Sequence, residues 1–186
     1  MIKYLISGFI AVFAQNIVFT KGLGSSTLLL AAKSRKQLLG IGVCLTFFSS
    51  VSSLMAYFVR SYHLNIDELF MPLIYAVIVG IIYIITLLAL LAFAKPLFVK
   101  VKGFVHVSAF NCAVMGALLI NAEKSGTSLT HLLSGLYCGI GFIAAGYMLK
   151  IVYPRMRADY VTPAFRGFPL MMIYLGILSM ALYCFT

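Results

Sequence analysis

The sequence predicts an all-α integral membrane protein with six transmembrane helices, arranged as an inverted repeat of three plus three with broken first and fourth helices. Of the 186 residues, 63% are hydrophobic and only 10% are charged, and the mean hydropathy is +1.08. Soluble domains are about half apolar and about a quarter charged. Apolar stretches near the roughly 20 residues that cross a bilayer occupy most of the chain. We therefore expect a single transmembrane domain over residues 1–186.

The first apolar stretch is too long for one straight span. It covers residues 2–32 and is interrupted at residues 21–26 by two glycines and two serines. We expect one helical piece to about Thr20, a non-helical break, and a short second piece. Irregular backbone at membrane depth is tolerated only where it is buried in protein or lines a cavity. Because membrane proteins build sites at such broken helices, Gly24, Ser25 and Ser26 are candidate site residues.

Five further spans are separated by short polar links. We expect them at about 38–59, 70–94, 104–120, 129–152 and 168–183. Residues 95–102 form a basic connector, and residues 153–166 form the longest polar link. The fifth span contains small residues that suit close helix contact, namely Gly135, Gly139, Gly141 and Gly146.

The fourth span carries a polar pair, Asn111 and Cys112, within the otherwise apolar stretch 108–121. Polar groups at membrane depth are costly and mark functional sites by default. The alternative is that Cys112 packs as a small hydrophobe and that Asn111 forms an interhelical hydrogen bond. The other cysteines, Cys44, Cys138 and Cys184, also lie in apolar runs without C-x-x-C spacing. A metal centre would therefore need ligands from distant segments or from another chain.

The charges predict the topology. The net charge of +10 comes from basic residues in the links between apolar runs, which is typical of membrane topology and not of nucleic acid binding. One face of the six-span arrangement collects ten basic residues: Lys33, Arg35, Lys36, Lys95, Lys100, Lys102, Lys150, Arg155, Arg157 and Arg166. The other collects Lys3, Arg60 and Lys124. Because Lys and Arg accumulate on the cytoplasmic side, we expect both termini outside the cytoplasm.

The six spans divide into two halves, residues 1–95 and 96–186. An odd number of spans in each half inverts the second half relative to the first. Each half opens with a span that carries an asparagine among small or polar residues, Asn16 in one and Asn111 in the other. This pattern is expected of an inverted repeat with its site at the pseudo-twofold axis.

The chain resembles the small six-span subunits of the Rnf and Nqr respiratory complexes, most closely the RnfA/NqrE type. The most specific matching segments are NCAVMGALLIN at residues 111–121 and VTPAFRGFP at residues 161–169, with a weaker match in QNIVFTKGLG at residues 15–24. The resemblance implies a bacterial or archaeal inner (cytoplasmic) membrane and a homologous, inverted partner subunit (RnfE/NqrD-like) among other complex subunits. It also implies a 2Fe–2S cluster between the two, to which each subunit gives one cysteine from its first span and one from its fourth. The A/E-type subunit would have its termini outside the cytoplasm.

One residue departs from the family pattern. Cys112 matches the fourth-span cysteine, but Ser26 stands where the first-span cysteine is expected. Iron–sulfur clusters are normally held by four cysteine thiolates, and a serine hydroxyl is far less suited to soft metals. Three alternatives stay open: a cluster with Ser26 or another group as the fourth ligand, a shifted alignment, or a relative that has lost or altered the cluster.

The expected function is therefore that of an electron-transfer membrane subunit in a redox-driven ion-translocating oxidoreductase, not catalytic alone and with no flavin or nucleotide site of its own. All four acids, Asp67, Glu68, Glu123 and Asp159, fall in links or at span ends, so a complete ion path is not expected within this chain. The competing hypothesis is a paralogue without a cluster, acting as a scaffold or as a small transporter-like or channel-like subunit. Such a subunit would use Ser25, Ser26 and Asn111 to bind a small solute or ion.

Overall fold

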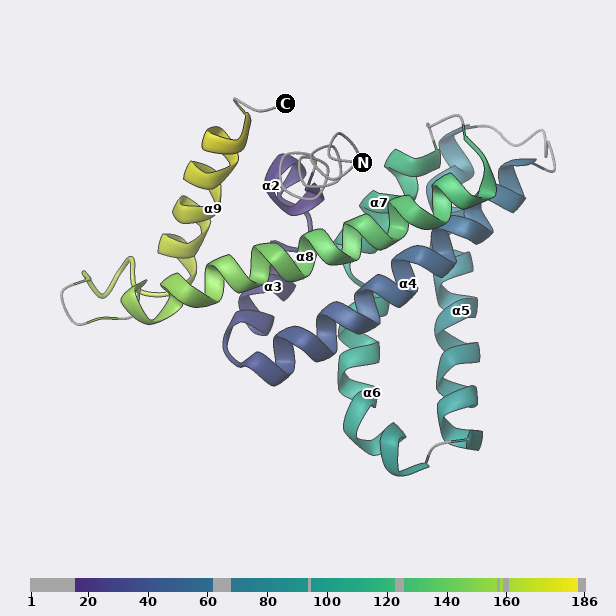
Figure 1. The fold of residues 1–186 in the computed structure, drawn as a ribbon, viewed down its shortest axis with the longest axis horizontal. Coiled ribbons are helices and arrows are strands. Elements are labelled where there is room, and N and C mark those ends of the chain that lie inside the picture. Colours follow the sequence, from purple (N-terminus) through teal and green to yellow (C-terminus); the bar gives the residue numbers. More distant parts are fainter. Residues whose placement is uncertain are drawn as a thin grey trace, which may run out of the picture. The chain divides into compact units, whose positions relative to one another are not determined.

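The computed structural model describes residues 16–61, 68–93, 95–122, 126–156, 158 and 161–183. At Glu68, Phe93 and Leu97 it describes the backbone. The described part is helical (Figure 1). Its elements are α2 (Ile17–Lys21), α3 (Ser25–Ala32), α4 (Arg35–Ser61), the 3₁₀ helix η1 (Glu68–Phe70), α5 (Met71–Phe93), α6 (Lys95–Ala109), α7 (Cys112–Ala122), α8 (Ser128–Met156) and α9 (Phe168–Tyr183).

The described helices confirm a multi-pass, all-helical membrane protein. Three of them, α4, α5 and α8, are long and apolar enough to cross a bilayer. A fourth span is formed if α6 and α7, which meet at an angle of 49°, count as one broken span. The helix α9 is apolar but has only 16 residues. Part of the expected first span, residues 1–15, lies outside the described residues, so the count of six spans stays a prediction.

The helix bounds follow the sequence pattern with one clear difference. The last helix covers the predicted residues 168–183. The basic connector 95–102, in contrast, is helical and forms the first half of α6. Pro96 is the second residue of that helix, where its missing N–H costs no intrahelical bond. Because no helix-breaking residue follows until Gly103, the helix continues from the connector into the predicted fourth span.

Contacts group the chain into two compact units, which combine segments from both predicted halves. Unit 1 contains Met1–Leu39 and Ile140–Thr186, and unit 2 contains Gly40–Gly139. In unit 1, α9 packs against α2 and α3. In α8, the backbone of Gly146 approaches the side chains of Leu28 and Leu38, which are buried. This contact confirms the prediction that the small residues of the fifth span allow close helix contact.

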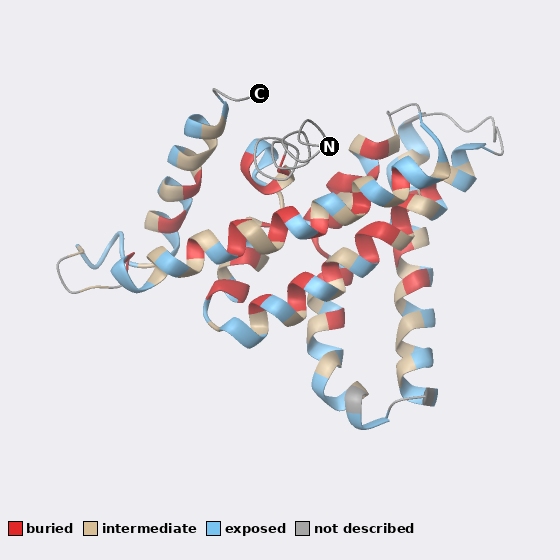
Figure 2. Ribbon diagram, in the orientation of Figure 1, coloured by how far each residue is buried: buried red, intermediate tan, exposed pale blue. Residues whose placement is uncertain are grey.

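In unit 2, α5 and α6 lie side by side as a helical hairpin, and α5 also contacts α7 (Figure 1). The helices α4 and α8 meet at two glycines: a Cβ on Gly135 would lie 2.6 Å from the Ser49 carbonyl oxygen, and one on Gly139 would meet Thr46. Buried residues follow one side of α4 (Figure 2). In α5, by contrast, only 17% of the most apolar 18-residue stretch is buried within this chain. The outer surface of α5 is therefore suited to lipid or to another subunit.

Candidate functional site

The first break lies in unit 1 and is short. The helix α2 ends at Lys21, and Gly22 and Gly24 adopt the left-handed backbone, with φ of 67° and 80°. Glycine is favoured at both positions because residues with a Cβ pay a steric cost there. The next helix, α3, begins at Ser25, so Ser25 and Ser26 form its first turn instead of belonging to the break. Ser25 is half-buried and Ser26 is exposed.

Asn16 fixes the helix that precedes this break. Its Oδ1 accepts a hydrogen bond of 3.0 Å from the Val18 N–H and so caps α2, while its Nδ2 donates to the Gly141 carbonyl of α8 at 2.7 Å. From α9, the Ser179 hydroxyl donates to the Phe19 carbonyl at 2.7 Å. These long-range bonds connect a five-residue helix to two others, and so hold the chain in place immediately before the break.

Replacing Asn16 with alanine is expected to destabilise unit 1 by about 1–3 kcal/mol, because it removes both a helix cap and an interhelical hydrogen bond. The measurement is the thermal unfolding midpoint of the full chain in mild detergent. Thr20→Val is the matched control, since the bond that the Thr20 hydroxyl forms within the described residues is a local one, to the Asn16 carbonyl of its own helical turn. Equal midpoints for the two variants would show that the bond to Gly141 contributes nothing.

The second break lies in unit 2, between α6 and α7, at Phe110 and Asn111. Asn111 is only 2% exposed, and its Oδ1 accepts a 3.0 Å hydrogen bond from the Ala113 N–H at the start of α7. Its backbone carbonyl accepts from the amides of Val114 and Met115. Asn111 is therefore the N-cap of the short helix that Cys112 opens.

The surroundings of Cys112 combine an exposed thiol with a buried amide donor. Cys112 is exposed, and its sulfur lies 3.7 Å from the Asn111 Oδ1. Phe110, which precedes Asn111 in the sequence, is 67% exposed. The Asn111 Nδ2 is buried and has no hydrogen-bond acceptor among the described residues. Buried polar groups are almost always paired, so this amide is a candidate contact for a further group.

Two polar contacts made by the helices on either side of this break were not predicted from the sequence. In the first, His106 of α6 and Tyr83 of α5 are hydrogen-bonded through Nδ1 and the phenol oxygen, and the Tyr83 ring packs edge-on against Phe110. In the second, the Asn121 amide joins α7 to α4 and α8: its Nδ2 donates to the Ser53 hydroxyl at 3.1 Å, and its Oδ1 accepts from Ser134. The sequence signal for this network is the group of four serines within the second span, at residues 49, 50, 52 and 53.

The predicted site residues are divided between the two units. Asn111 and Cys112 adjoin each other in unit 2, whereas Gly24, Ser25 and Ser26 belong to unit 1. Cys44 and Cys138 are half-buried, and the Cys138 sulfur lies 4.0 Å from the Ala113 carbonyl, while Cys184 lies outside the described residues. Within the described residues, no three His, Cys, Asp or Glu side chains come together in an arrangement that could hold a metal ion.

Comparison with known proteins gives one family over the full length. The family described as Rnf-Nqr subunit, membrane protein, matches residues 2–186. Relatives of the RnfA type, named as subunits of an ion-translocating oxidoreductase complex, are similar throughout. The protein from Glaesserella parasuis serovar 5 (strain SH0165) is 26% identical over 188 residues, covering 100% of this chain and 97% of that protein. The one from Vibrio campbellii (strain ATCC BAA-1116) is 25% identical over 188 residues, with coverages of 100% and 98%. The chain therefore belongs to the Rnf-Nqr family of membrane subunits.

Proposed function

We propose that this chain is an electron-transfer membrane subunit of an Rnf/Nqr-like ion-translocating oxidoreductase complex, in which Cys112 gives one thiolate to a 2Fe–2S cluster shared with a homologous six-span subunit. The proposal includes six spans in an inverted repeat and both termini outside the cytoplasm. The relatives' names support membership in such a complex. The single observation that carries the cluster is the exposed Cys112 beside a buried amide that has no acceptor among the described residues.

The residues at the second break fit one corner of such a cluster. A thiolate is the ligand that iron–sulfur clusters require, and Cys112 is exposed at a helix start within an apolar segment. Hydrogen bonds to cluster sulfur tune its reduction potential, and the Asn111 Nδ2 is a donor one residue away. A bound 2Fe–2S cluster would accept and release single electrons. Asn111 would then hold the start of α7 and donate a hydrogen bond, and Cys112 would provide the ligand.

The chain offers too few soft ligands to hold a cluster alone, which supports a shared site. Among the described residues, Cys112 is the exposed cysteine, and no group of three metal-binding side chains is formed. The remaining thiolates would come from a partner protein. Phe110, exposed next to Cys112, supports this because an exposed aromatic residue in an apolar segment is suited to contact with another subunit.

The test of the proposal is the iron content and the electron paramagnetic resonance (EPR) spectrum of the reduced complex, purified in detergent with its partner subunits. We expect a 2Fe–2S signal in addition to those of clusters in the other subunits. A complex without iron in its membrane part would contradict the proposal. It would favour the second candidate function, that of a family member without a cluster, which acts as a scaffold or transporter. The observation that supports this candidate is Ser26, which stands where the family resemblance leads us to expect a cysteine.

Replacing Ser26 with cysteine distinguishes among the explanations for this residue. If the Ser26 oxygen is a ligand, exchanging it for a softer thiolate is expected to change the EPR line shape and to raise the reduction potential, since oxygen ligands favour oxidised iron. Ser25→Cys is the matched control, because successive helical residues point about 100° apart. Identical spectra for the native complex and both variants would exclude Ser26 from the cluster. Iron gained only in Ser26→Cys would show that this chain has lost the cluster.

A further inference from the structure

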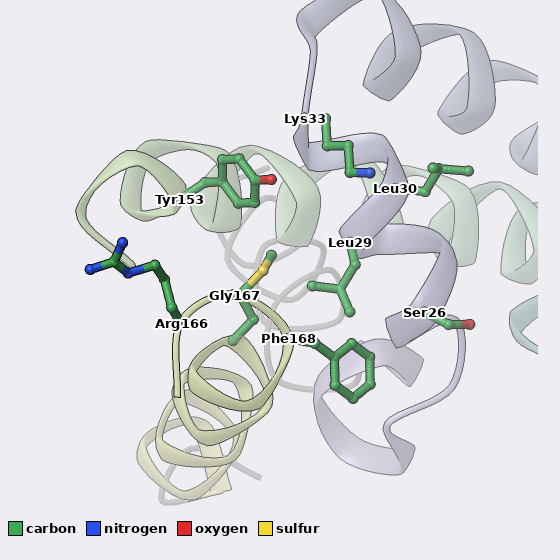
Figure 3. Close-up of a pocket in the computed structure, with 9 residues that line it drawn as sticks. Ser26, Leu29, Leu30, Lys33, Tyr153, Arg166, Gly167 and Phe168 are labelled. Atoms are coloured by element: carbon green, nitrogen blue, oxygen red, sulfur yellow. The ribbon is translucent and has the colours of Figure 1, made fainter. Parts of the chain in front are cut away.

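Unit 1 contains a cavity of about 410 Å³ next to α3, the end of α8 and the start of α9. Its volume falls within the roughly 300–1,000 Å³ that is typical of small-molecule sites. Figure 3 shows the lining residues: Leu29 and Lys33 come from α3 and its C-terminal cap, Tyr153 from α8, and Phe168 from α9. All of them belong to unit 1, whereas the polar pair at the second break belongs to unit 2.

One part of the cavity wall is cationic. Lys33 and Arg166 both line it, and the described lining residues include no acid. In Figure 3 the Tyr153 ring points toward α3, whereas the Arg166 guanidinium extends away from that helix. Arg166 donates a hydrogen bond of 3.1 Å to the Val161 carbonyl, which ties it to its own loop beside the cavity. The Lys33 ammonium and the Tyr153 phenol hydroxyl are groups that bind phosphate oxygens, and Arg166 adds positive charge beside the cavity.

The other part of the wall is apolar and continues onto the outer surface of the chain. Leu29 and Met171 line the cavity, and Leu30 and Phe168 at its edge are 40% and 54% exposed. A free inorganic anion would gain nothing from this apolar wall. A ligand with an anionic head and a hydrocarbon tail would match both parts of the cavity at once.

The position of the cations along the chain favours a lipid. Lys33 directly follows α3, and Arg166 lies two residues before α9, so both stand at the ends of apolar helices where lipid head groups lie. Both belong to the set of ten basic residues that the sequence predicts on the cytoplasmic face. Basic pockets between transmembrane helices on that side bind anionic lipid head groups.

We propose that the cavity lined by Lys33, Tyr153, Arg166 and Phe168 binds the head group of an anionic phospholipid, with its acyl chains lying over the apolar edge. The Lys33 ammonium and the Tyr153 hydroxyl bind the phosphate, and Arg166 adds positive charge beside it from its own loop. The cavity is too small for a whole phospholipid, so the acyl chains remain in the bilayer. This site does not depend on a cluster or on electron transfer.

The test is native mass spectrometry of the full chain after delipidation, titrated with phosphatidylglycerol or with zwitterionic phosphatidylcholine. We expect one tightly bound phosphatidylglycerol and no equivalent phosphatidylcholine. Each basic residue near an anionic lipid head group contributes enough binding free energy to change the affinity about fivefold. The Lys33→Gln/Arg166→Gln variant should therefore bind phosphatidylglycerol about 25-fold more weakly. Lys33→Arg keeps the charge and should bind like the native chain.

The matched control is Arg35→Gln/Lys36→Gln, which removes two charges from the same region that do not line the cavity. If both double variants lose affinity equally, or if the two lipids bind equally, the chain has only a general attraction for anionic membranes and the proposal is wrong. The titration is repeated on the purified complex. If a partner protein blocks the cavity there, a protein segment is the occupant and the lipid proposal is overturned.

Discussion

Replacing Gly135 with valine is expected to prevent α4 and α8 from packing, and to leave little monodisperse protein after extraction in mild detergent. A Cβ at this position would lie 2.6 Å from both the Ser49 carbonyl oxygen and the Ser50 Cα. Both are backbone atoms, so no change of side-chain rotamer relieves the clash and the helices must separate. Overpacking typically costs about 1–3 kcal/mol where side chains can move, and we expect about 3 kcal/mol or more here.

Gly80→Val is the matched control for this prediction. Gly80 lies within α5 of the same unit, and a Cβ there would meet nothing within 4 Å. Both variants place the same β-branched residue inside a helix, so the difference between them isolates the contact between α4 and α8. The measurements are the size-exclusion profile and the thermal unfolding midpoint of the full chain. If Gly135→Val behaves like Gly80→Val, α4 and α8 do not approach each other closely at Gly135.

Local chemistry explains which parts of the fold could be predicted from the sequence. Glycines at residues 22 and 24 indicate the first break because few other residues adopt a left-handed backbone cheaply. The start of α9 follows Gly167, and the apolar run that ends at Tyr183 defines its length. The glycines of the fifth span predicted close contacts, which the structure confirms at Gly135, Gly139 and Gly146. The basic connector was not predicted as helical, because its charges indicated topology and obscured its lack of helix-breaking residues.

The candidate site could be predicted only in part. The polar pair Asn111–Cys112 is visible in the sequence because it interrupts an apolar run. Its most informative feature, the Asn111 Nδ2 without an acceptor among the described residues, depends on which side chains surround it in the fold. The same is true of Asn16, whose partner Gly141 is 125 residues away. The cavity with Lys33 and Arg166 likewise joins segments that no local pattern connects.

Replacing Cys112 with alanine is expected to abolish the membrane 2Fe–2S signal and to reduce electron transfer through the complex to background. The loss should come from chemistry and not from unfolding. Cys112 is exposed, so alanine removes little buried surface. The variant loses the weak 3.7 Å contact from the thiol to the Asn111 Oδ1, but that oxygen keeps its 3.0 Å hydrogen bond from the Ala113 N–H. The measurements are the EPR spectrum of the reduced complex, its iron content, and its electron-transfer rate relative to the native complex.

Cys44→Ala is the control, because Cys44 is a half-buried thiol within α4 and has no role in the proposed cluster. It should keep the signal and the rate, with at most a small loss of stability from the missing sulfur atom. Both variant complexes must first show the native set of subunits on size exclusion. Should Cys112→Ala keep the signal and the rate as well, Cys112 would not be a cluster ligand. Its exposure beside Phe110 would then indicate only a surface that packs against lipid or against another subunit.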